Sequence, residues 1–240
     1  QIRIRLLDRN ANETFSDSFW KRRVEYAWNY RKTVMSAEDL DACRIIHGES
    51  DQLPGVTVDK FHDLLVVQIL SYGMEQRKEL WLPHLAQLLE KDGYPVRGIM
   101  ERNDDVLREK EGLSMNKGWY PWKSIPDSPE VVITENGIQY TVDVLNGQKT
   151  GFFLDQKYNR RVVGELVKGM TVLDCFTHTG SFALNAAKGG AKHVTAVDVS
   201  ASAIEMAKRN AQRNHLDDVM DFVVADVFDW LPTIEGHPYD

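Results

Sequence analysis

The sequence lacks any long apolar run. No stretch of its 240 residues approaches eighteen uninterrupted apolar side chains, which excludes a transmembrane helix. It contains only two cysteines, Cys43 and Cys175, too far apart for a metal-binding spacing, so we predict neither a disulfide framework nor a metal site. It also lacks a net positive charge: its formal charge is −7, which excludes nucleic-acid binding by bulk electrostatics alone. We therefore expect a cytoplasmic protein without a membrane partner.

The first 35 residues depart from this charge balance, because eight basic and four acidic side chains give them a local charge of 8 − 4 = +4. The pattern is typical of a solvated helix face, and a phosphate-binding patch is the alternative. The chain opens with residues 1–7 (QIRIRLL), which contain neither an initiator Met nor a signal-peptide core, and whose alternation predicts a strand. We expect the chain to begin inside a longer protein.

Residues 11–145 predict an α+β unit. A capping-box pattern at 14–17 precedes a helix, and short β-branched runs at 43–51, 53–59 and 63–70 indicate a small antiparallel sheet. Residues 74–91 have helical periodicity that Pro83 interrupts, so we expect a kink there or a restart near Leu82. The face predicted to be buried on the first helix consists of Trp20, Val24, Ala27, Arg31 and Val34.

A strand at 96–102 is followed by a charged segment, 103–117, that is too hydrophilic for a core. It predicts either a surface excursion or part of a substrate channel. Asn136-Gly137, between alternating runs at 131–134 and 138–144, predicts a β-hairpin.

From Asp155 onward, helical and strand patterns alternate. Asp155 can cap a helix that Gly169 is placed to end, and strands follow at 171–175, 194–198 and 221–225, with helices between them. This β-α-β-α-β order predicts an α/β fold with a parallel sheet. The predicted apolar face of the first helix consists of Tyr158, Val162, Val163, Leu166 and Val167.

Three acidic residues, Asp174, Asp198 and Asp226, lie at the ends of these three strands. Because the carboxyl ends of parallel strands share one edge of a sheet, the carboxylates should converge there. Asp198 follows Asp174 at about the sequence distance at which a carboxylate binds a ribose, where it can accept hydrogen bonds from both hydroxyls. Asp226 could accept a hydrogen bond from an adenine amino group. The alternative is that all three are ordinary caps at strand ends.

The loop at 175–181 (CFTHTGS) indicates which cofactor would bind. It has one glycine, whereas a dinucleotide site needs G-x-G-x-x-G and a Walker loop ends in Gly-Lys-Ser/Thr. Small hydroxyl side chains around a single glycine favour a cofactor without phosphates, such as S-adenosylmethionine. His178 could contact the cofactor or serve as a structural histidine.

Several motifs resemble those of the bacterial large-subunit ribosomal RNA methyltransferases. They are residues 148–156 (QKTGFFLDQ) with Asn159 and Arg160, 172–182 (VLDCFTHTGSF) and 197–200 (VDVS), together with 47–59 and 101–104 upstream. The chain is most similar to the cytosine-5 family, in which a PUA domain precedes a central α+β domain and a class I methyltransferase domain. Nearly the whole chain takes part in this resemblance.

The resemblance implies the end of a PUA-like domain at 1–10, a central α+β domain at 11–145 and the first part of a Rossmann-like, S-adenosylmethionine-dependent methyltransferase domain at 146–240. It implies ribosomal RNA as the partner and leaves a homodimer open. It also implies that Asp198 binds the ribose and Asp226 the adenine. The residues expected to bind or neighbour the cofactor are Phe153, Asp155, Arg160, Asp174, Phe176, Thr177, His178, Thr179, Gly180, Ser181, Asp198, Val199, Ser200, Asp226 and Val227.

In that family, an Asp-Pro-Pro motif and a nucleophilic cysteine lie further downstream than Asp240. Formation of 5-methylcytosine requires a thiolate, and we interpret both Cys43 and Cys175 as small buried residues instead. The catalytic residues therefore stay unassigned, and we expect this chain alone to be inactive. Two alternatives stay open: an RNA guanine methyltransferase of the same extended family, and a non-catalytic RNA-binding module.

Overall fold

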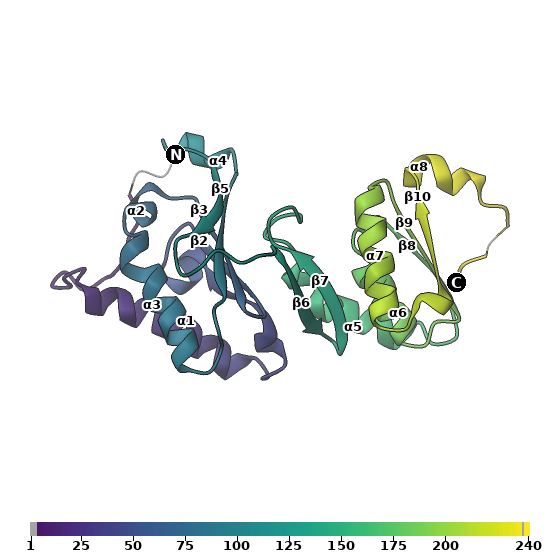
Figure 1. Cartoon of the computed structure of the whole chain (residues 1–240), viewed down its shortest axis with the longest axis horizontal. Helices are drawn as coiled ribbons and strands as arrows, with labels where there is room; N and C mark the ends of the chain where they lie inside the picture. Colours follow the sequence, from purple (N-terminus) through teal and green to yellow (C-terminus); the bar gives the residue numbers. More distant parts are fainter. Residues whose placement is uncertain (1–3, 237) are drawn as a thin grey trace. The chain divides into compact units, whose positions relative to one another are not determined.

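The computed structural model describes residues 4–236 and 238–240, and these divide into two compact units (Figure 1). Unit 1 comprises Gln1–Ile133 with Val142–Leu154, and unit 2 comprises Thr134–Thr141 with Asp155–Asp240. Within the described residues, no helix combines the length and apolar character needed to cross a bilayer.

Unit 1 is built on a five-stranded sheet in which the strands lie in chain order. Neighbouring strands are antiparallel except for the β3–β4 pair, which is parallel. The strands are β1 (Ala42–His47), β2 (Val56–Phe61), β3 (Leu64–Ile69), β4 (Gly98–Asn103) and β5 (Asn116–Tyr120). The helices are α1 (Asp17–Val34), α2 (Tyr72–Glu75), α3 (Lys78–Lys91) and α4 (Leu107–Lys110), with 3-10 turns η1 (Asp39–Asp41) and η2 (Gly48–Asp51).

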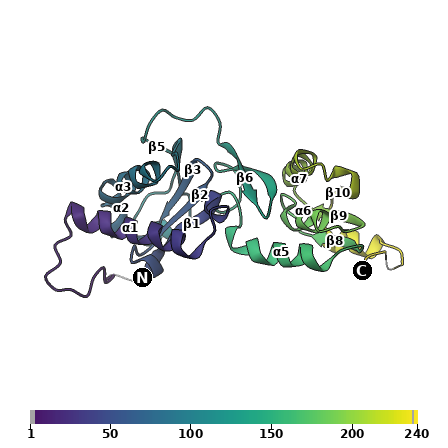
Figure 2. The ribbon, with the colours of Figure 1, turned by 90° about the horizontal axis from the view of Figure 1, so that it is seen from below.

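Both faces of this sheet are covered, which explains why its central strands β2, β3 and β4 are almost continuously buried. Helices α1 and α3 lie side by side on one face (Figure 2), where Trp20, Trp28 and Trp81 are fully buried. The segment that follows β7 covers the other face. There the Thr150 hydroxyl donates to the buried carboxylate of Asp59 at 2.6 Å.

The predicted helix over 17–34 is confirmed, with two local corrections. Ser16 precedes its first residue and makes no side-chain capping bond, so the capping-box prediction was wrong. Val34 is 52% exposed, because it lies in the last turn and beyond the sheet that buries the rest of the predicted face.

Two other predictions for unit 1 need correction. Residues 4–8 form no strand, because Leu7 packs against the core and its carbonyl accepts a hydrogen bond from Arg23; residues 1–3 lie outside the described part. The helix break falls before Lys78, so Pro83 lies inside α3.

The charged segment lies largely at the surface over residues 104–117, which is one of its two predicted interpretations. It contains the short helix α4. Arg108 is the exception, buried because its guanidinium binds two backbone carbonyls and the Glu75 carboxylate.

The predicted hairpin is confirmed. Strands β6 (Glu130–Glu135) and β7 (Ile138–Asp143) are joined by Asn136 and Gly137, whose φ angles are 53° and 69°. Two successive positive φ angles are what a two-residue turn between twisted strands requires.

Unit 2 contains the predicted β-α-β-α-β arrangement as a parallel sheet of order β10-β9-β8. The strands are β8 (Thr171–Cys175), β9 (His193–Asp198) and β10 (Met220–Val224). The helices are α5 (Lys157–Leu166), α6 (Ser181–Lys188), α7 (Ala201–Arg213) and α8 (Val227–Trp230), with 3-10 turns η3 (Leu154–Gln156), η4 (Asp217–Val219) and η5 (Leu231–Thr233).

Helix α5 buries a different face from the one predicted. Lys157, Arg160 and Gly164 are buried, whereas Tyr158, Val162 and Leu166 are exposed and Val163 and Val167 are half-buried. The reason is a close approach to α6: a Cβ at Gly164 would lie 2.8 Å from the carbonyl oxygen of Asn185. The absence of a side chain at this position, rather than apolar character, sets the packing face of α5.

Candidate cofactor site

The loop between β8 and α6 has an unusual backbone. Phe176 and His178 have φ angles of 60° and 53°, a region that non-glycine residues rarely adopt. Gly180 has a φ of 82°, and a Cβ there would lie 2.9 Å from the Cβ of Ala207. The single glycine of the loop therefore serves both a left-handed conformation and a close approach to α7.

Asp174 holds this loop from within. Its Oδ2 accepts hydrogen bonds from the Thr177 hydroxyl at 2.5 Å and from the backbone N–H of Ala183 at 3.0 Å. Burial raises the pKa of Asp174 above its ordinary value, and the nearby carboxylate of Asp198 contributes in the same direction. The side chain thus fixes the start of α6 and places a carboxyl group under the loop.

Asp198 connects the ends of all three strands. Its Oδ2 accepts from the backbone N–H of His178 and its Oδ1 from that of Ser200, both at 2.9 Å. Its backbone carbonyl accepts from the N–H of Ala225 at 3.0 Å. Each carboxylate oxygen has a second lone pair, and the side chain is only half-buried, so Asp198 can accept further hydrogen bonds from a ligand.

The electrostatics of the site are unfavourable for phosphate. The carboxyl groups of Asp174 and Asp198 lie beside the loop, and residues 174–181 contain no Lys or Arg. Burial lowers the pKa of His178 below its ordinary value of 6.5, with Asp198 acting in the opposite direction, so the ring is neutral at pH 7. A neutral or cationic ligand therefore fits this edge of the sheet better than an anionic one.

Asp226 follows β10, is exposed and caps α8. Its Oδ1 accepts from the backbone N–H of Phe228 at 2.8 Å. The rings of Phe176 and Phe228 contact each other, with centroids 5.7 Å apart and ring planes inclined by 54°. Their exposed fractions are 60% and 75%, and Val199 is 68% exposed, so an apolar side chain is open to solvent beside each acidic residue.

Phe228 is the residue that the sequence prediction missed. A signal for it was present, because in each of the three strand-end segments an apolar side chain follows the acidic residue within two positions: Phe176, Val199 and Phe228. Such side chains could enclose an adenine ring, which needs apolar contact on its faces.

The other predicted residues of unit 2 fall into two groups. At the loop and helix starts, the Thr179 carbonyl accepts from Asn210, Ser181 begins α6, Ser200 caps α7 through the N–H of Ala203, and Val227 is buried at the start of α8. The Arg160 guanidinium donates to Glu135 at 2.7 and 2.9 Å, both side chains are 1% exposed, and its Cζ lies 5.9 Å from the centroid of the Phe182 ring in the first turn of α6. Asp155 is exposed in η3.

Phe153 is half-buried and belongs to unit 1. Within the described ranges, no three His, Cys, Asp or Glu side chains are grouped so that they could hold a metal ion. Cys175 is half-buried, and burial raises the pKa of its thiol.

A parallel sheet with a carboxylate at each strand end, around a loop that opens a helix, defines a class I methyltransferase type of cofactor site. Comparison with known proteins agrees: residues 117–240 match the family of S-adenosylmethionine-dependent methyltransferases. The chain belongs to this family, whose methyl donor is S-adenosylmethionine.

Among curated proteins, the chain is 44% identical over 232 residues to the ribosomal RNA large subunit methyltransferase I of Pseudoalteromonas translucida. The match covers 96% of this chain and 57% of that protein, so the chain spans little more than half the length of this relative.

Among solved structures, a candidate SAM-dependent methyltransferase from Streptococcus mutans superposes with a TM-score of 0.76 at 25% identity, over 92% of this chain and 55% of its own. A crystal structure of a methyltransferase complexed with SAH gives the same TM-score, identity and coverage.

Proposed function

We propose that this chain forms the cofactor-binding part of a ribosomal RNA methyltransferase. The observation that carries the proposal is Asp198, whose half-buried carboxylate links the loop after β8 to the start of α7 and keeps hydrogen-bonding capacity toward solvent. The RNA substrate is supported by the relative from Pseudoalteromonas translucida, whose name states this activity.

The residues present fit S-adenosylmethionine. Asp198 would bind the ribose hydroxyls, and Asp226 with the backbone of Val227 would bind the adenine. Phe176 and Phe228, whose rings contact each other with centroids 5.7 Å apart, would together form an apolar surface against the adenine. The bound cofactor supplies an electrophilic methyl group on a positively charged sulfonium, and the acidic edge of the sheet would stabilise that charge.

Calorimetric titration with SAH tests the ribose role. We expect Asp198→Ala to weaken binding at least tenfold, because hydrogen bonds to a charged group contribute about 1.5–3 kcal/mol each. Asp221→Ala is the matched control, since Asp221 lies at the other end of β10 and pairs with His193. Equal SAH affinity for the native chain and Asp198→Ala would sink the assignment.

We further propose that the product is 5-methylcytosine and that this chain alone binds the cofactor without transferring its methyl group. Cytosine C5 becomes nucleophilic only after a thiolate adds to C6, and the C5 proton and the thiolate leave after methylation. Neither cysteine suits this role. Cys43 is 3% exposed, and burial disfavours the thiolate of Cys175.

Incubation of large-subunit ribosomal RNA with the chain and methyl-labelled S-adenosylmethionine tests this proposal. We expect no incorporation of label. Labelled RNA would refute the inactivity, and digestion to nucleosides would then identify the methylated base. Labelled guanosine would also refute the assignment of cytosine.

A further inference from the structure

Two adjoining hollows lie on unit 1 beside α1, with volumes of about 400 and 380 Å³. They share Arg23 and Gln52, so they form one continuous depression between α1, η2 and the segment at 6–9. We refer to the surface lined by Arg9, Arg23, Tyr26, Tyr30, His47 and Gln52 as the α1 groove. None of these residues takes part in the candidate cofactor site.

Two aromatic side chains lie open along the α1 groove. Tyr26 and Tyr30 are 60% and 59% exposed and are separated by one helical turn, so they are neighbours on the surface of α1. The opposite face of the same helix is buried through Trp20, Val24 and Trp28. The core therefore does not account for the two tyrosines, which line a hollow; the Arg31 guanidinium lies over the Tyr30 ring, 5.3 Å from its centroid.

The charges of the α1 groove favour an anion. Arg23 is 7% exposed, and its guanidinium already donates through Nη2 to the Leu7 carbonyl and to Asp8. Arg9 is exposed and makes no ion pair in the part of the chain that the structure describes, so its guanidinium is available to an anion.

The remaining ionised groups do not cancel this preference. Arg31 pairs with Asp51, and Asp51 also accepts from the backbone N–H of His47 at 2.6 Å. Among the Arg, Lys, Asp and Glu side chains that line the groove, Arg9, Arg23 and Arg31 against Asp8 and Asp51 give 3 − 2 = +1. This local charge contrasts with the −7 of the whole chain.

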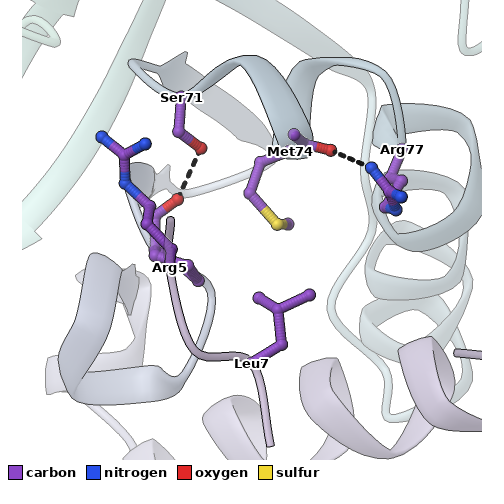
Figure 3. A pocket seen from close by; sticks show the side chains of 7 residues that line it. Arg5, Leu7, Ser71, Met74 and Arg77 are labelled. Carbon is purple, nitrogen blue, oxygen red and sulfur yellow. Dashed lines mark hydrogen bonds between the residues drawn. The ribbon is translucent and has the colours of Figure 1, made fainter. Parts of the chain in front are cut away.

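A third hollow of about 220 Å³ illustrates a less suitable surface (Figure 3). Figure 3 shows Leu7 and Met74 pointing toward each other across it. Its polar side chains already have protein partners: Ser71 and Arg77 donate to backbone carbonyls at 2.7 and 3.0 Å, and Arg5 donates to a carboxylate. It has no exposed aromatic pair, so we assign no ligand to it.

Exposed aromatic rings beside arginine side chains are the combination that holds single-stranded nucleic acid, because bases stack on the rings and the cations bind the backbone. We propose that the α1 groove binds an unpaired stretch of RNA, with bases stacked on Tyr26 and Tyr30 and a phosphate bound by Arg9. This inference rests on the proposed function in that RNA is taken as the substrate.

Fluorescence anisotropy with an unstructured 12-nucleotide RNA and with a duplex of the same sequence tests the proposal. For the double variant Tyr26→Ala/Tyr30→Ala we expect at least tenfold weaker binding of the single strand, since one base stacked on an aromatic ring corresponds to roughly 5- to 150-fold in affinity. Tyr26→Phe/Tyr30→Phe should bind within twofold of the native chain, because stacking needs the ring and not the hydroxyl.

Tyr72→Ala is the matched control, because Tyr72 is a 49% exposed tyrosine of unit 1 outside the α1 groove, and its loss should leave binding unchanged. Arg9→Ala should reduce the slope of log K against log salt by about 0.7, the value for one phosphate contact on a single strand. Circular dichroism of the tyrosine variants should show an intact fold, as alanine is the strongest helix former.

Native-like RNA binding by the double alanine variant, or equal affinity for the duplex, would overturn the assignment of the α1 groove. SAH titration of the same variants separates this failure from failure of the proposed function. If the double alanine variant binds both SAH and RNA as the native chain does, only the assignment of the α1 groove is refuted. If the native chain itself fails to bind SAH, the proposed cofactor site is refuted.

Discussion

The buried ion pair between Glu135 and Arg160 leads to the prediction that most directly tests the interpretation of unit 2. The family resemblance implies that Arg160 lines the cofactor or its neighbourhood, and the structure pairs its guanidinium with Glu135, the last residue of β6. The two bonds, 2.7 and 2.9 Å long, form a fork between side chains that are each 1% exposed. If this pair holds the hairpin tip to α5, breaking it should reduce stability while leaving the affinity of folded molecules for SAH unchanged.

The expected loss of stability follows from the burial of Glu135, which stays in the protein when Arg160 is replaced. Removing one member of a buried ion pair typically costs about 3–5 kcal/mol, because the remaining charge is buried without compensation. We therefore expect Arg160→Met to lower the free energy of unfolding of unit 2 by that amount. The double variant Glu135→Leu/Arg160→Met should recover most of the loss, since replacing both charges by apolar side chains is often neutral or stabilising.

Urea denaturation, with hydrogen exchange of peptides from β8 and β9 as a probe specific to unit 2, measures the effect. Arg161→Met is the control, because Arg161 is the next residue of α5 and its pair with Glu165 is exposed and 4.0 Å long. We expect a change within about 0.5 kcal/mol for that variant. Equal effects of Arg160→Met and Arg161→Met, or weaker SAH binding by the folded fraction of Arg160→Met, would refute the structural role of Arg160.

Three further predictions concern the candidate site. Gly180→Ala should destabilise unit 2 by about 2–4 kcal/mol in urea titrations, because the left-handed backbone and the contact with Ala207 both disfavour a Cβ. Phe228→Ala should weaken SAH binding roughly tenfold in calorimetry with little change in stability, since its ring is exposed and contacts Phe176. Burial raises the pKa of Asp174, so the folded state binds the proton of this carboxyl more tightly than the unfolded chain does. The free energy of unfolding of the native chain, measured relative to that of Asp174→Asn, should therefore fall as the pH rises from 3.8, the ordinary pKa of Asp, through the raised pKa of the folded state. A difference in unfolding free energy that stays constant with pH would contradict this.

The order of elements in unit 2 was predictable because each signal was local. Strand and helix periods differ, and a parallel sheet is the arrangement that a β-α-β-α-β order produces. The convergence of Asp174 and Asp198 followed from the same rule, since strand ends share an edge. The hairpin was predictable for a similar reason: Asn136-Gly137 satisfies the two positive φ angles that its turn requires.

The failures share one cause, which is that burial depends on partners distant in sequence. Arg108 was assigned to a surface segment because it is charged, yet its backbone and carboxylate partners bury it to 2% exposure. Helix α5 packs through Gly164 because the α6 backbone approaches it closely. Residues 4–8 alternate like a strand, but Leu7 packs on the core of unit 1 instead.

The two interpretations of the strand-end carboxylates, structural caps or cofactor ligands, are not exclusive. Asp198 does cap the loop, since it accepts the N–H groups of His178 and Ser200, and these bonds keep its carboxylate at one position before any ligand binds. A protein side chain that is already fixed loses little conformational entropy when a ligand binds to it. The two hydrogen bonds that make Asp198 a structural cap also hold its carboxylate ready for a ligand. They therefore support the proposed role of Asp198 toward the ribose.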